Sequence, residues 1–307
     1  MAIKIAVASG KGGTGKTTVV TNLALAIGDT KKVVVGDCDV EEPNSHIFIG
    51  ADMKKVKDVS LLVPRIDENL CDLCGECVKA CEYHALALIG DRVMFFEELC
   101  SGCGGCALVC PQRAITEVER PIGTVRRGVS DKKPLADPQK GGAGGVVLID
   151  GVLNVGEARA TPVIKEVKRT AEKEGRDVII YDAPPGTSCP VIETLSGADF
   201  VLLVTEPTPF GLHDLKLAVD VVKKMGLRFG VVINKDGLGY GGLEEYLSEE
   251  KIPVLLRIPH SEKTASMYSM GTALVETDEK WKKEFAGLYE KTVALSNAGD
   301  GMKREVV

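Results

Sequence analysis

The feature of this 307-residue chain that most restricts its fold is a glycine-rich loop between an apolar run and an amphipathic segment. Residues 10–17, GKGGTGKT, match the pattern G-x-x-x-x-G-K-[ST]. The preceding IKIAVAS predicts a short buried strand, and residues 16–27 carry apolar side chains at helical spacing. Glycines let backbone N–H groups surround phosphates, and the start of a helix adds a partial positive charge. The sequence therefore predicts a strand–loop–helix unit that binds the phosphates of a nucleotide.

Two side chains of this loop have roles that follow from the pattern. Lys16 is expected to bridge the β- and γ-phosphates, and the Thr17 hydroxyl is expected to coordinate Mg²⁺. The residues expected to contact the nucleotide here are Gly10, Lys11, Gly12, Gly13, Thr14, Gly15, Lys16, Thr17 and Thr18.

Strands and helices are expected to alternate along most of the chain. Further strands are predicted over residues 32–37, 146–150, 177–183, 200–206, 230–235 and 253–259, and further helices over 162–174, 190–196, 212–225, 243–249 and 279–296. These strands are continuously apolar, which is typical of a parallel sheet buried on both faces. The predicted fold class is therefore α/β, with helices on both faces of a parallel sheet. Residues 120–145, rich in Gly, Pro and charge, predict a loop with room for a hairpin.

A cysteine-rich segment interrupts this alternation. Eight of the ten cysteines lie between residues 71 and 110, in two runs with the spacing C-x₂-C-x₂-C-x₃-C. We predict a first part of the α/β domain at 1–59, an inserted small α+β domain at 60–118, and the second part of the α/β domain at 119–307. Paired cysteines also occur in zinc sites, but these need two pairs rather than a third and a fourth cysteine at this spacing.

The two runs resemble those of bacterial-type two-cluster ferredoxins, in which three thiolates of a run hold one [4Fe–4S] cluster and the fourth reaches the other. One ligand set implied by the resemblance is Cys71, Cys74, Cys77 and Cys110. The second is Cys100, Cys103, Cys106 and Cys81. Glu82 departs from the pattern, which usually has proline there; no ligand is lost by this change.

The nucleotide loop contains a second lysine, Lys11, and K-G-G-x-G-K-T resembles the deviant phosphate loop of the MinD, ParA, Mrp and nitrogenase-iron-protein family. The resemblance covers about residues 1–60 and 120–275. It implies ATP as the nucleotide and a homodimer in which Lys11 reaches the partner's phosphates across a shared nucleotide site.

Further segments follow the same resemblance. Asp37 and Asp39 come after the second predicted strand, where the family has its first switch; Asp37 would help to organise the magnesium shell and Asp39 would orient the attacking water. Asp182 precedes APPGT, where the family has a carboxylate that holds Mg²⁺. The implied catalytic residues are Lys11, Lys16, Asp39 and Asp182, and the implied magnesium ligands are Thr17, Asp37 and Asp182. Asn234 and Lys235 resemble the family's adenine-contacting segment.

Two cysteines lie outside the runs. Cys189 follows Asp182 by seven residues, the offset at which the nitrogenase iron protein has one ligand of a bridging cluster. The position of the other ligand falls at Glu157, so a small buried thiol or a reactive thiol in a switch is the favoured interpretation of Cys189. Cys38 is expected to be a small packed side chain.

Composition excludes some functional classes. The net charge is −6, with acidic and basic residues interleaved, and no apolar run reaches the length of a membrane span. We therefore expect a cytoplasmic protein that neither binds nucleic acid nor inserts stably into membranes. The amphipathic C-terminal segment is expected to dock on the sheet through Trp281, Phe285 and Leu288.

These observations favour a Mg-ATP-dependent dimeric switch coupled to electron transfer through two [4Fe–4S] clusters, with a redox partner. The alternative is an Mrp-like carrier that delivers iron–sulfur clusters or metals to an apo-protein client, with the ferredoxin-type clusters in a structural or reductive role. A positioning ATPase that acts at membranes or on DNA is the third class.

Overall fold

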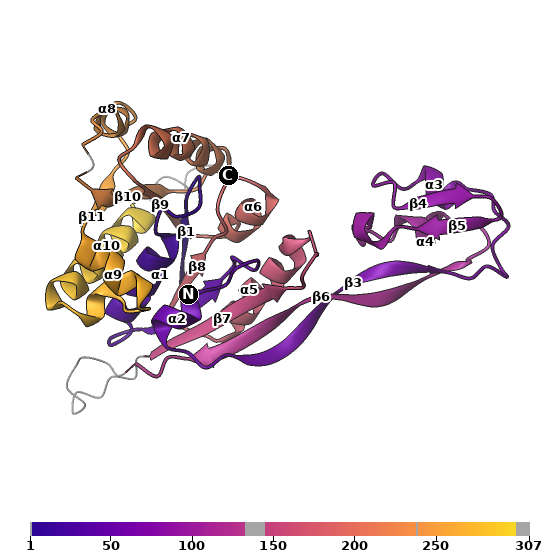
Figure 1. Ribbon diagram of the computed structural model, residues 1–307, viewed down its shortest axis with the longest axis horizontal. Coiled ribbons are helices and arrows are strands. Elements are labelled where there is room, and N and C mark those ends of the chain that lie inside the picture. The colour runs from indigo at the N-terminus through magenta and orange to yellow at the C-terminus, as the bar shows by residue number, and fades with distance from the viewer. Residues whose placement is uncertain (1, 133–144, 238, 299–307) are drawn as a thin grey trace, which may run out of the picture.

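A computed structural model describes residues 2–132, 145–237 and 239–298 and consists of a large body, a projecting arm and a small module (Figure 1). The elements of the body are β1 (Ile3–Ala8), α1 (Lys16–Ile27), β2 (Lys32–Asp37), α2 (Ser45–Ile49), β7 (Gly145–Leu153), α5 (Ala160–Lys173), β8 (Val178–Asp182), α6 (Cys189–Leu195), β9 (Phe200–Thr205), α7 (Pro209–Lys224), β10 (Phe229–Asp236), α8 (Gly242–Glu249), β11 (Val254–Pro259), α9 (Glu262–Ser269), the 3₁₀ turn η2 (Leu274–Glu276) and α10 (Glu279–Asn297). The arm consists of β3 (Lys54–Ile66) and β6 (Ile115–Val129).

One nine-stranded sheet runs through the body and into the arm, in the order β11-β10-β9-β1-β8-β2-β7-β6-β3. The strands from β11 to β7 are parallel, whereas β6 and β3 are antiparallel to their neighbours. The expected α/β class and the large, mostly parallel sheet are thus confirmed, with two antiparallel strands added at one edge.

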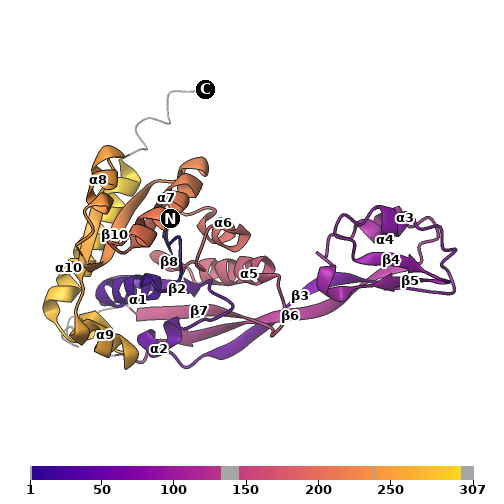
Figure 2. The same ribbon diagram turned by 45° about the horizontal axis from the view of Figure 1, so that its top comes forward.

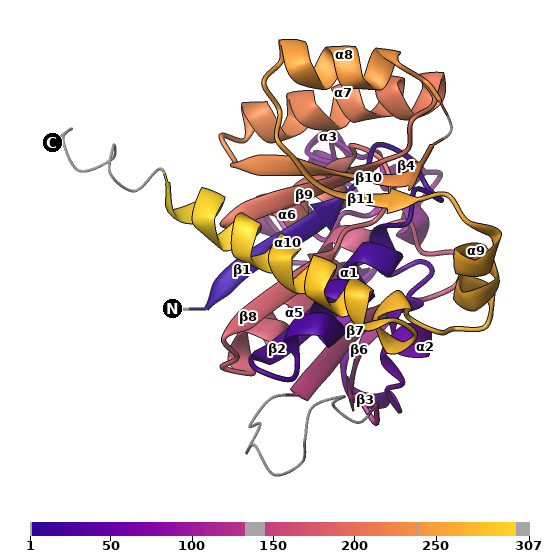
Figure 3. The same ribbon diagram turned by 90° about the vertical axis from the view of Figure 1, so that its left-hand side faces the viewer.

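Helices cover both faces of this sheet. On one face α1 and α10 lie side by side (Figure 3), where Leu23 and Phe285 are fully buried against the sheet. The other face is covered by α5, α6, α7 and α8, whose apolar side chains, such as Val163 and Val219, are also fully buried. Helices α5 and α7 present apolar residues at i, i+3, i+4 and i+7 to the sheet, the spacing from which they were predicted.

The predicted strands and helices of the body agree with the structure, apart from shifts of a few residues at their ends. The predicted helix over 16–27 coincides with α1. Two short helices, α2 and α9, were not predicted. Both are half-exposed and make part of the nucleotide cavity described below, so neither carries a long apolar repeat.

The prediction of a loop over residues 120–145 was wrong for its first ten residues, because β6 continues to Val129. The loop was predicted from the content of Gly, Pro and charge, and a proline cannot donate to a ladder. In the structure Pro121 lies opposite Ser60 at an irregularity of the β3–β6 ladder, where a proline is tolerated. Residues 133–144 of this predicted loop lie outside the described residues.

The arm carries the module, residues 67–114, away from the body (Figures 1 and 2). The module consists of the short helices α3 (Glu76–Lys79) and α4 (Gly105–Val109), the hairpin β4 (Leu86–Ile89) and β5 (Arg92–Phe95), and the 3₁₀ turn η1 (Glu97–Leu99). Both arm strands run continuously through the predicted domain boundaries at 59/60 and 118/119, so the two parts share a ladder instead of a flexible linker.

The C-terminal helix packs as the sequence predicted. Phe285 and Leu288 are fully buried in the cluster beneath α10, and Trp281 packs against its edge. Among the described residues, no helix is both long and apolar enough to cross a membrane.

We predict that Phe285→Ala lowers the free energy of unfolding by about 3–5 kcal/mol, because it leaves a cavity between α10 and the sheet. Urea unfolding followed by circular dichroism measures this change. Phe210→Ala is the matched control, since the Phe210 side chain is 77% exposed and its loss should change stability by less than about 0.5 kcal/mol. Equal effects of the two substitutions would contradict the packing.

Candidate nucleotide site and cysteine module

The phosphate loop joins β1 to α1 and has a conformation that requires glycine. Gly13 and Gly15 have φ angles of 75° and 95°, in the left-handed region. A Cβ atom on Gly15 would lie 2.3 Å from the side-chain nitrogen of Asn234. That nitrogen donates to the carbonyl oxygen of Thr14 at 2.8 Å, so β10 holds the loop directly. The predicted residue Asn234 therefore shapes the loop itself.

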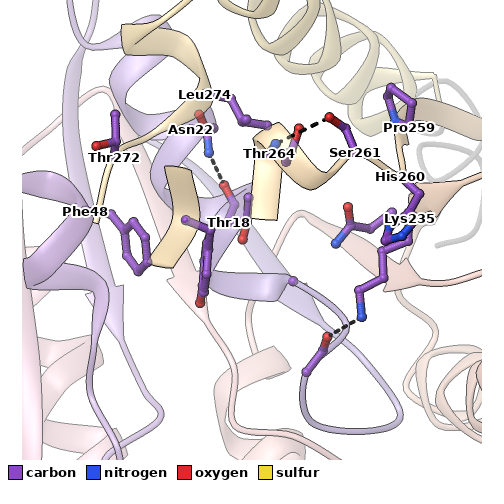
Figure 4. A pocket seen from close by; sticks show the side chains of 14 residues that line it. Thr18, Asn22, Phe48, Lys235, Pro259, His260, Ser261, Thr264, Thr272 and Leu274 are labelled. Carbon is purple, nitrogen blue, oxygen red and sulfur yellow. Dashed lines mark hydrogen bonds between the residues drawn. The ribbon is translucent and has the colours of Figure 1, made fainter. Parts of the chain in front are cut away.

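A cavity of about 320 Å³ opens beside this loop (Figure 4). Of the predicted contacts, Gly13, Gly15, Thr18, Asn234 and Lys235 line it. The remaining lining residues were not predicted: Asn22, Phe48, Pro259, His260, Ser261, Thr264, Tyr268, Thr272 and Leu274.

Most of these unpredicted residues come from α2, α9 and the chain around them. The rings of Phe48 and Tyr268 stack with centroids 4.6 Å apart, which joins two segments 220 residues distant in the chain. No local sequence pattern could have paired them. A mostly apolar cavity next to backbone N–H groups fits a nucleotide, with its base and sugar in the cavity and its phosphates in the loop.

Two carboxylates meet at the carboxyl ends of β2 and β8. Asp37 and Asp182 are direct partners in the register of these parallel strands, and both side chains are buried. Asp37 accepts hydrogen bonds from the backbone N–H groups of Asp39 and Ser45, both at 3.1 Å. Asp182 Oδ2 accepts from the Thr17 hydroxyl at 2.7 Å, whereas its Oδ1 is buried and has no hydrogen-bond partner among the described residues. A buried oxygen of this kind fits a hard cation such as Mg²⁺.

The electrostatics of these carboxylates also favour a cation. Burial raises the pKa of Asp37 to about 7, despite the hydrogen bonds that oppose this. Burial and the neighbouring Asp37 raise the pKa of Asp182 well above its usual range. Burial raises the pKa of Asp39 to about 6, while the nearby Lys16 ammonium opposes the shift. The cluster thus has more negative charge than Lys16 can neutralise, which a divalent cation would correct.

Lys11 is held by its own chain. Its ammonium donates to Glu206 Oε1 at 2.5 Å, and the ammonium of Lys235 donates to Glu206 Oε2 at 2.9 Å and to the carbonyl oxygen of Gly13 at 3.3 Å. Burial alone would raise the pKa of Glu206, but the hydrogen bonds from the two lysines hold it below its usual value. Lys11 must therefore leave Glu206 before it can contact a second chain.

The cysteines of the two runs intermingle in the module. Cys81 of the first run lines one small cavity together with Cys100, Cys103 and Cys106 of the second. Burial raises the pKa of Cys77, and the charges of Cys71 and Cys110 add to this, so the fourth cysteine of the second run lies near the first run. This reciprocal grouping is the one that the ferredoxin resemblance implies.

Backbone N–H groups point at several of these sulfurs. The N–H of Ala85 donates to Cys81 Sγ at 3.3 Å, and the N–H of Ala114 donates to Cys110 Sγ at the same distance. Gly102, with a φ of 72°, donates to Cys100 Sγ at 3.4 Å. Such N–H···S contacts stabilise negative charge on sulfur, as an iron–sulfur site requires.

The donor set can be compared with two kinds of metal group. Within the described residues, no three His, Cys, Asp or Glu side chains are close enough together to hold one metal ion. A tetrahedral zinc ion needs sulfurs about 3.8 Å apart, as follows from its Zn–S bond length. A [4Fe–4S] cluster binds each thiolate through a different iron atom and needs a wider ring. The thiolate donors and their grouping fit a cluster, and the ligand assignment stays a prediction.

The two remaining cysteines differ in exposure. Cys38 is fully buried, as predicted, and burial raises the pKa of its thiol. Cys189 is exposed at the first residue of α6, which excludes the buried interpretation, and the interpretation as a reactive thiol stays a prediction. Glu157, the counterpart of a missing cluster ligand, is buried in ion pairs with Arg120 at 2.7 Å and Arg159 at 2.8 Å.

Comparison with known proteins agrees with this geometry. Residues 5–274 match the family model described as the CobQ/CobB/MinD/ParA nucleotide binding domain. The chain belongs to this family. It is a P-loop NTPase of the MinD/ParA type.

Individual relatives span nearly the whole chain. An uncharacterized protein of Methanocaldococcus jannaschii is 32% identical over 90% of this chain and 92% of its own length. The iron-sulfur cluster carrier protein of Pyrococcus horikoshii is 25% identical over 98% of this chain and 89% of its own. Among solved structures, the septum site-determining protein MinD of Pyrococcus horikoshii, complexed with Mg-ADP, superposes with a TM-score of 0.57 at 21% identity, over 97% of this chain and 98% of that one. The last similarity concerns the fold alone.

We predict that Asp37→Asn stabilises the nucleotide-free, magnesium-free protein at pH 8. Because the pKa of Asp37 rises from about 4 in the unfolded chain to about 7 when folded, the folded chain binds more protons between these values. Its free energy of unfolding therefore falls as pH rises from about 4 to about 7. The amide cannot ionise, so the variant should gain about 1–4 kcal/mol at pH 8 and nothing below pH 4.

Urea unfolding in the presence of a chelator at pH 4 and pH 8 checks this prediction, with Asp52→Asn, an exposed carboxylate, as the control. The same variant should lose Mg²⁺ binding. A destabilised Asp37→Asn at pH 8 would show that Asp37 is not the source of the pH dependence.

Proposed function

We propose that this chain is a Mg-ATP-driven dimeric switch whose hydrolysis cycle is coupled to electron transfer through two [4Fe–4S] clusters on the arm. The observation that carries the proposal is the mixed cavity of the module, where Cys81 joins Cys100, Cys103 and Cys106 although it belongs to the other run. ATP binding and hydrolysis by the body do not require a cavity that brings cysteines of two separate runs together.

On the nucleotide side, the phosphate loop and Lys16 hold the phosphates while Thr17 and Asp182 hold Mg²⁺. The unpaired Oδ1 of Asp182 supports this role, and buried Asp37 keeps the negative charge near the ion. Asp39, with a pKa raised to about 6 by burial, orients the attacking water at the end of the first switch. Asn234 and Lys235 position the base from the cavity wall.

The dimer forms across the nucleotide site. Lys11 exchanges its bond to Glu206 for the phosphates of the partner subunit, and the loss of this ion pair opposes dimerisation until nucleotide is bound. Lys235 stays on Glu206 and keeps the released carboxylate paired.

On the module side, Cys71, Cys74, Cys77 and Cys110 hold one cluster and Cys100, Cys103, Cys106 and Cys81 hold the other. When bound, the clusters supply one-electron transfer at low potential. The protein contributes the N–H···S contacts of Ala85, Ala114 and Gly102 and a partly buried environment for the thiolates. A redox partner docks on the module.

We expect Lys16→Ala to lower the ATPase rate by at least about 100-fold without loss of bound iron, because the phosphate loop and the cysteines lie in separate parts of the chain. Lys31→Ala, which changes an exposed lysine in the turn between α1 and β2, is the control. Iron content and ATP hydrolysis are measured on anaerobically purified protein.

The coupling itself is tested by electron paramagnetic resonance of the dithionite-reduced protein before and after addition of ATP. In wild type, ATP should change the spectrum of the clusters, and reduction of the clusters should change the ATPase rate. The spectrum of Lys16→Ala should not change on addition of ATP. Protein without iron, or a spectrum that ignores ATP in the wild type, would refute the proposal.

A carrier of iron–sulfur clusters is the second candidate, supported by the similarity to the iron-sulfur cluster carrier protein of Pyrococcus horikoshii. Exposed Cys189, beside the segment that follows Asp182, would then hold cargo for an apo-protein client. We expect cluster transfer to an apo-acceptor to be lost in Cys189→Ala if this function is correct. Undiminished transfer by that variant would remove Cys189 from the pathway, and Cys38→Ala serves as a control that changes a buried thiol.

A further inference from the structure

One turn of the body, residues 154–159, which follows β7, makes hydrogen bonds to the module. Its first residue, Asn154, is tied to the arm: its N–H donates to the carbonyl oxygen of Ile122, and its side chain donates to that of Pro121 at 3.0 Å. Gly156, with a φ of 82°, closes the turn. The turn therefore has a fixed position relative to the base of the arm.

Arg159, at the end of this turn, binds the backbone at and just before Cys100, a predicted cluster ligand. Its guanidinium donates to the carbonyl oxygens of Glu98, at 2.9 Å, and Cys100, and lies 3.5 Å from that of Glu97. The carbonyl oxygen of Glu97 also accepts from the N–H of Cys100 at 3.2 Å, which closes the turn η1, so Arg159 binds the backbone on both sides of that turn's last bond. A planar guanidinium can satisfy several such acceptors at once, which a lysine cannot.

Glu157 holds Arg159 in place. Its side chain is 3% exposed and accepts from Arg159 Nε at 2.8 Å and from Arg120, on β6, at 2.7 Å. Burial alone would raise the pKa of Glu157, but the two arginines hold it below its usual value, so the carboxylate stays ionised. We call Glu157, Arg159 and Arg120 the clamp.

The other end of the clamp meets the two switch segments. Ala160, the residue after Arg159, begins α5 and is one wall of a cavity of about 190 Å³. The other walls are residues 38–42, which include Asp39, and the prolines and serine between Pro184 and Pro190, which follow Asp182. A movement of either segment at this cavity would displace Ala160, which directly follows Arg159 in the chain.

We propose that the clamp is the route by which the nucleotide state of the switches reaches the cluster held by Cys100, with Arg159 as the positioning residue for that cluster. This inference rests on the proposed function. It also implies that the cluster of Cys81, Cys100, Cys103 and Cys106 is the one that responds to ATP, because among the described residues the clamp makes its hydrogen bond to a predicted ligand at Cys100.

The test compares wild-type protein with Arg159→Ala and with Arg159→Lys, which keeps the charge next to Glu157 but loses the planar fork. Arg169→Ala is the matched control, since Arg169 lies on α5, is 67% exposed and makes one ion pair at 3.9 Å. Hydrogen–deuterium exchange of residues 97–103, with and without a non-hydrolysable ATP analogue, needs no bound iron. Electron paramagnetic resonance of the reduced protein is the second measurement.

We expect the analogue to change exchange in residues 97–103 at least twofold in wild type and in Arg169→Ala. The change in exchange should be absent in Arg159→Ala and reduced in Arg159→Lys. The ATPase rates of these variants should stay within about twofold of wild type. The ATP-dependent change in the electron paramagnetic resonance spectrum should be lost. A nucleotide response that persists in Arg159→Ala, or is missing from wild type, overturns the inference. If wild type contains no iron but shows the Arg159-dependent exchange response, the electron-transfer function fails while the clamp stands.

Discussion

Two buried carboxylates that face each other at the ends of neighbouring strands dominate the chemistry of this molecule. The parallel register of β2 and β8 places Asp37 opposite Asp182, and burial makes their simultaneous ionisation unfavourable. The segments predicted as switches begin at these strand ends, so a ligand that neutralises the carboxylates would also act on the chain that follows them. The phosphate loop supplies the third side of the site through Thr17, and both carboxylate side chains are buried.

The elements that could be predicted from sequence are those whose signal is local. Helix α1 and the buried strands carry apolar patterns over their whole length, and the phosphate loop has a fixed spacing of glycines and a lysine. Asp37 and Asp182 were predicted as magnesium ligands by resemblance, on the ground that each follows such a strand. In the structure both lie at the ends of neighbouring strands.

The elements that escaped prediction depend on distant partners. Strand β6 contains Pro121 and several charges, and it becomes a strand only because β3 and β7 pair with it on either side. Tyr268 has no pattern around it, and its ring matters because Phe48 lies against it. In the sequence, Glu157 and Arg159 are simply two charged residues in a turn. In the folded chain, Arg120 pairs with Glu157, and three carbonyl groups of the module lie around the Arg159 guanidinium. Charge in a loop predicts exposure, and only the folded chain shows that Glu157 is buried.

The arm ends the sheet with β3, a thirteen-residue strand that has no neighbouring strand on its outer edge in the part of the chain that the structure describes. Long edges of this kind can recruit a strand from another molecule and start aggregation. The exposed residues at the start of β3 include Lys54, Lys55, Lys57 and Asp58, and Pro64 further along lacks an N–H to offer. Charges and a proline are the means by which natural sheets keep such edges unpaired. The arm can thus hold the cysteines at a distance from the body while its exposed strand edge is protected from pairing with other molecules and from aggregation.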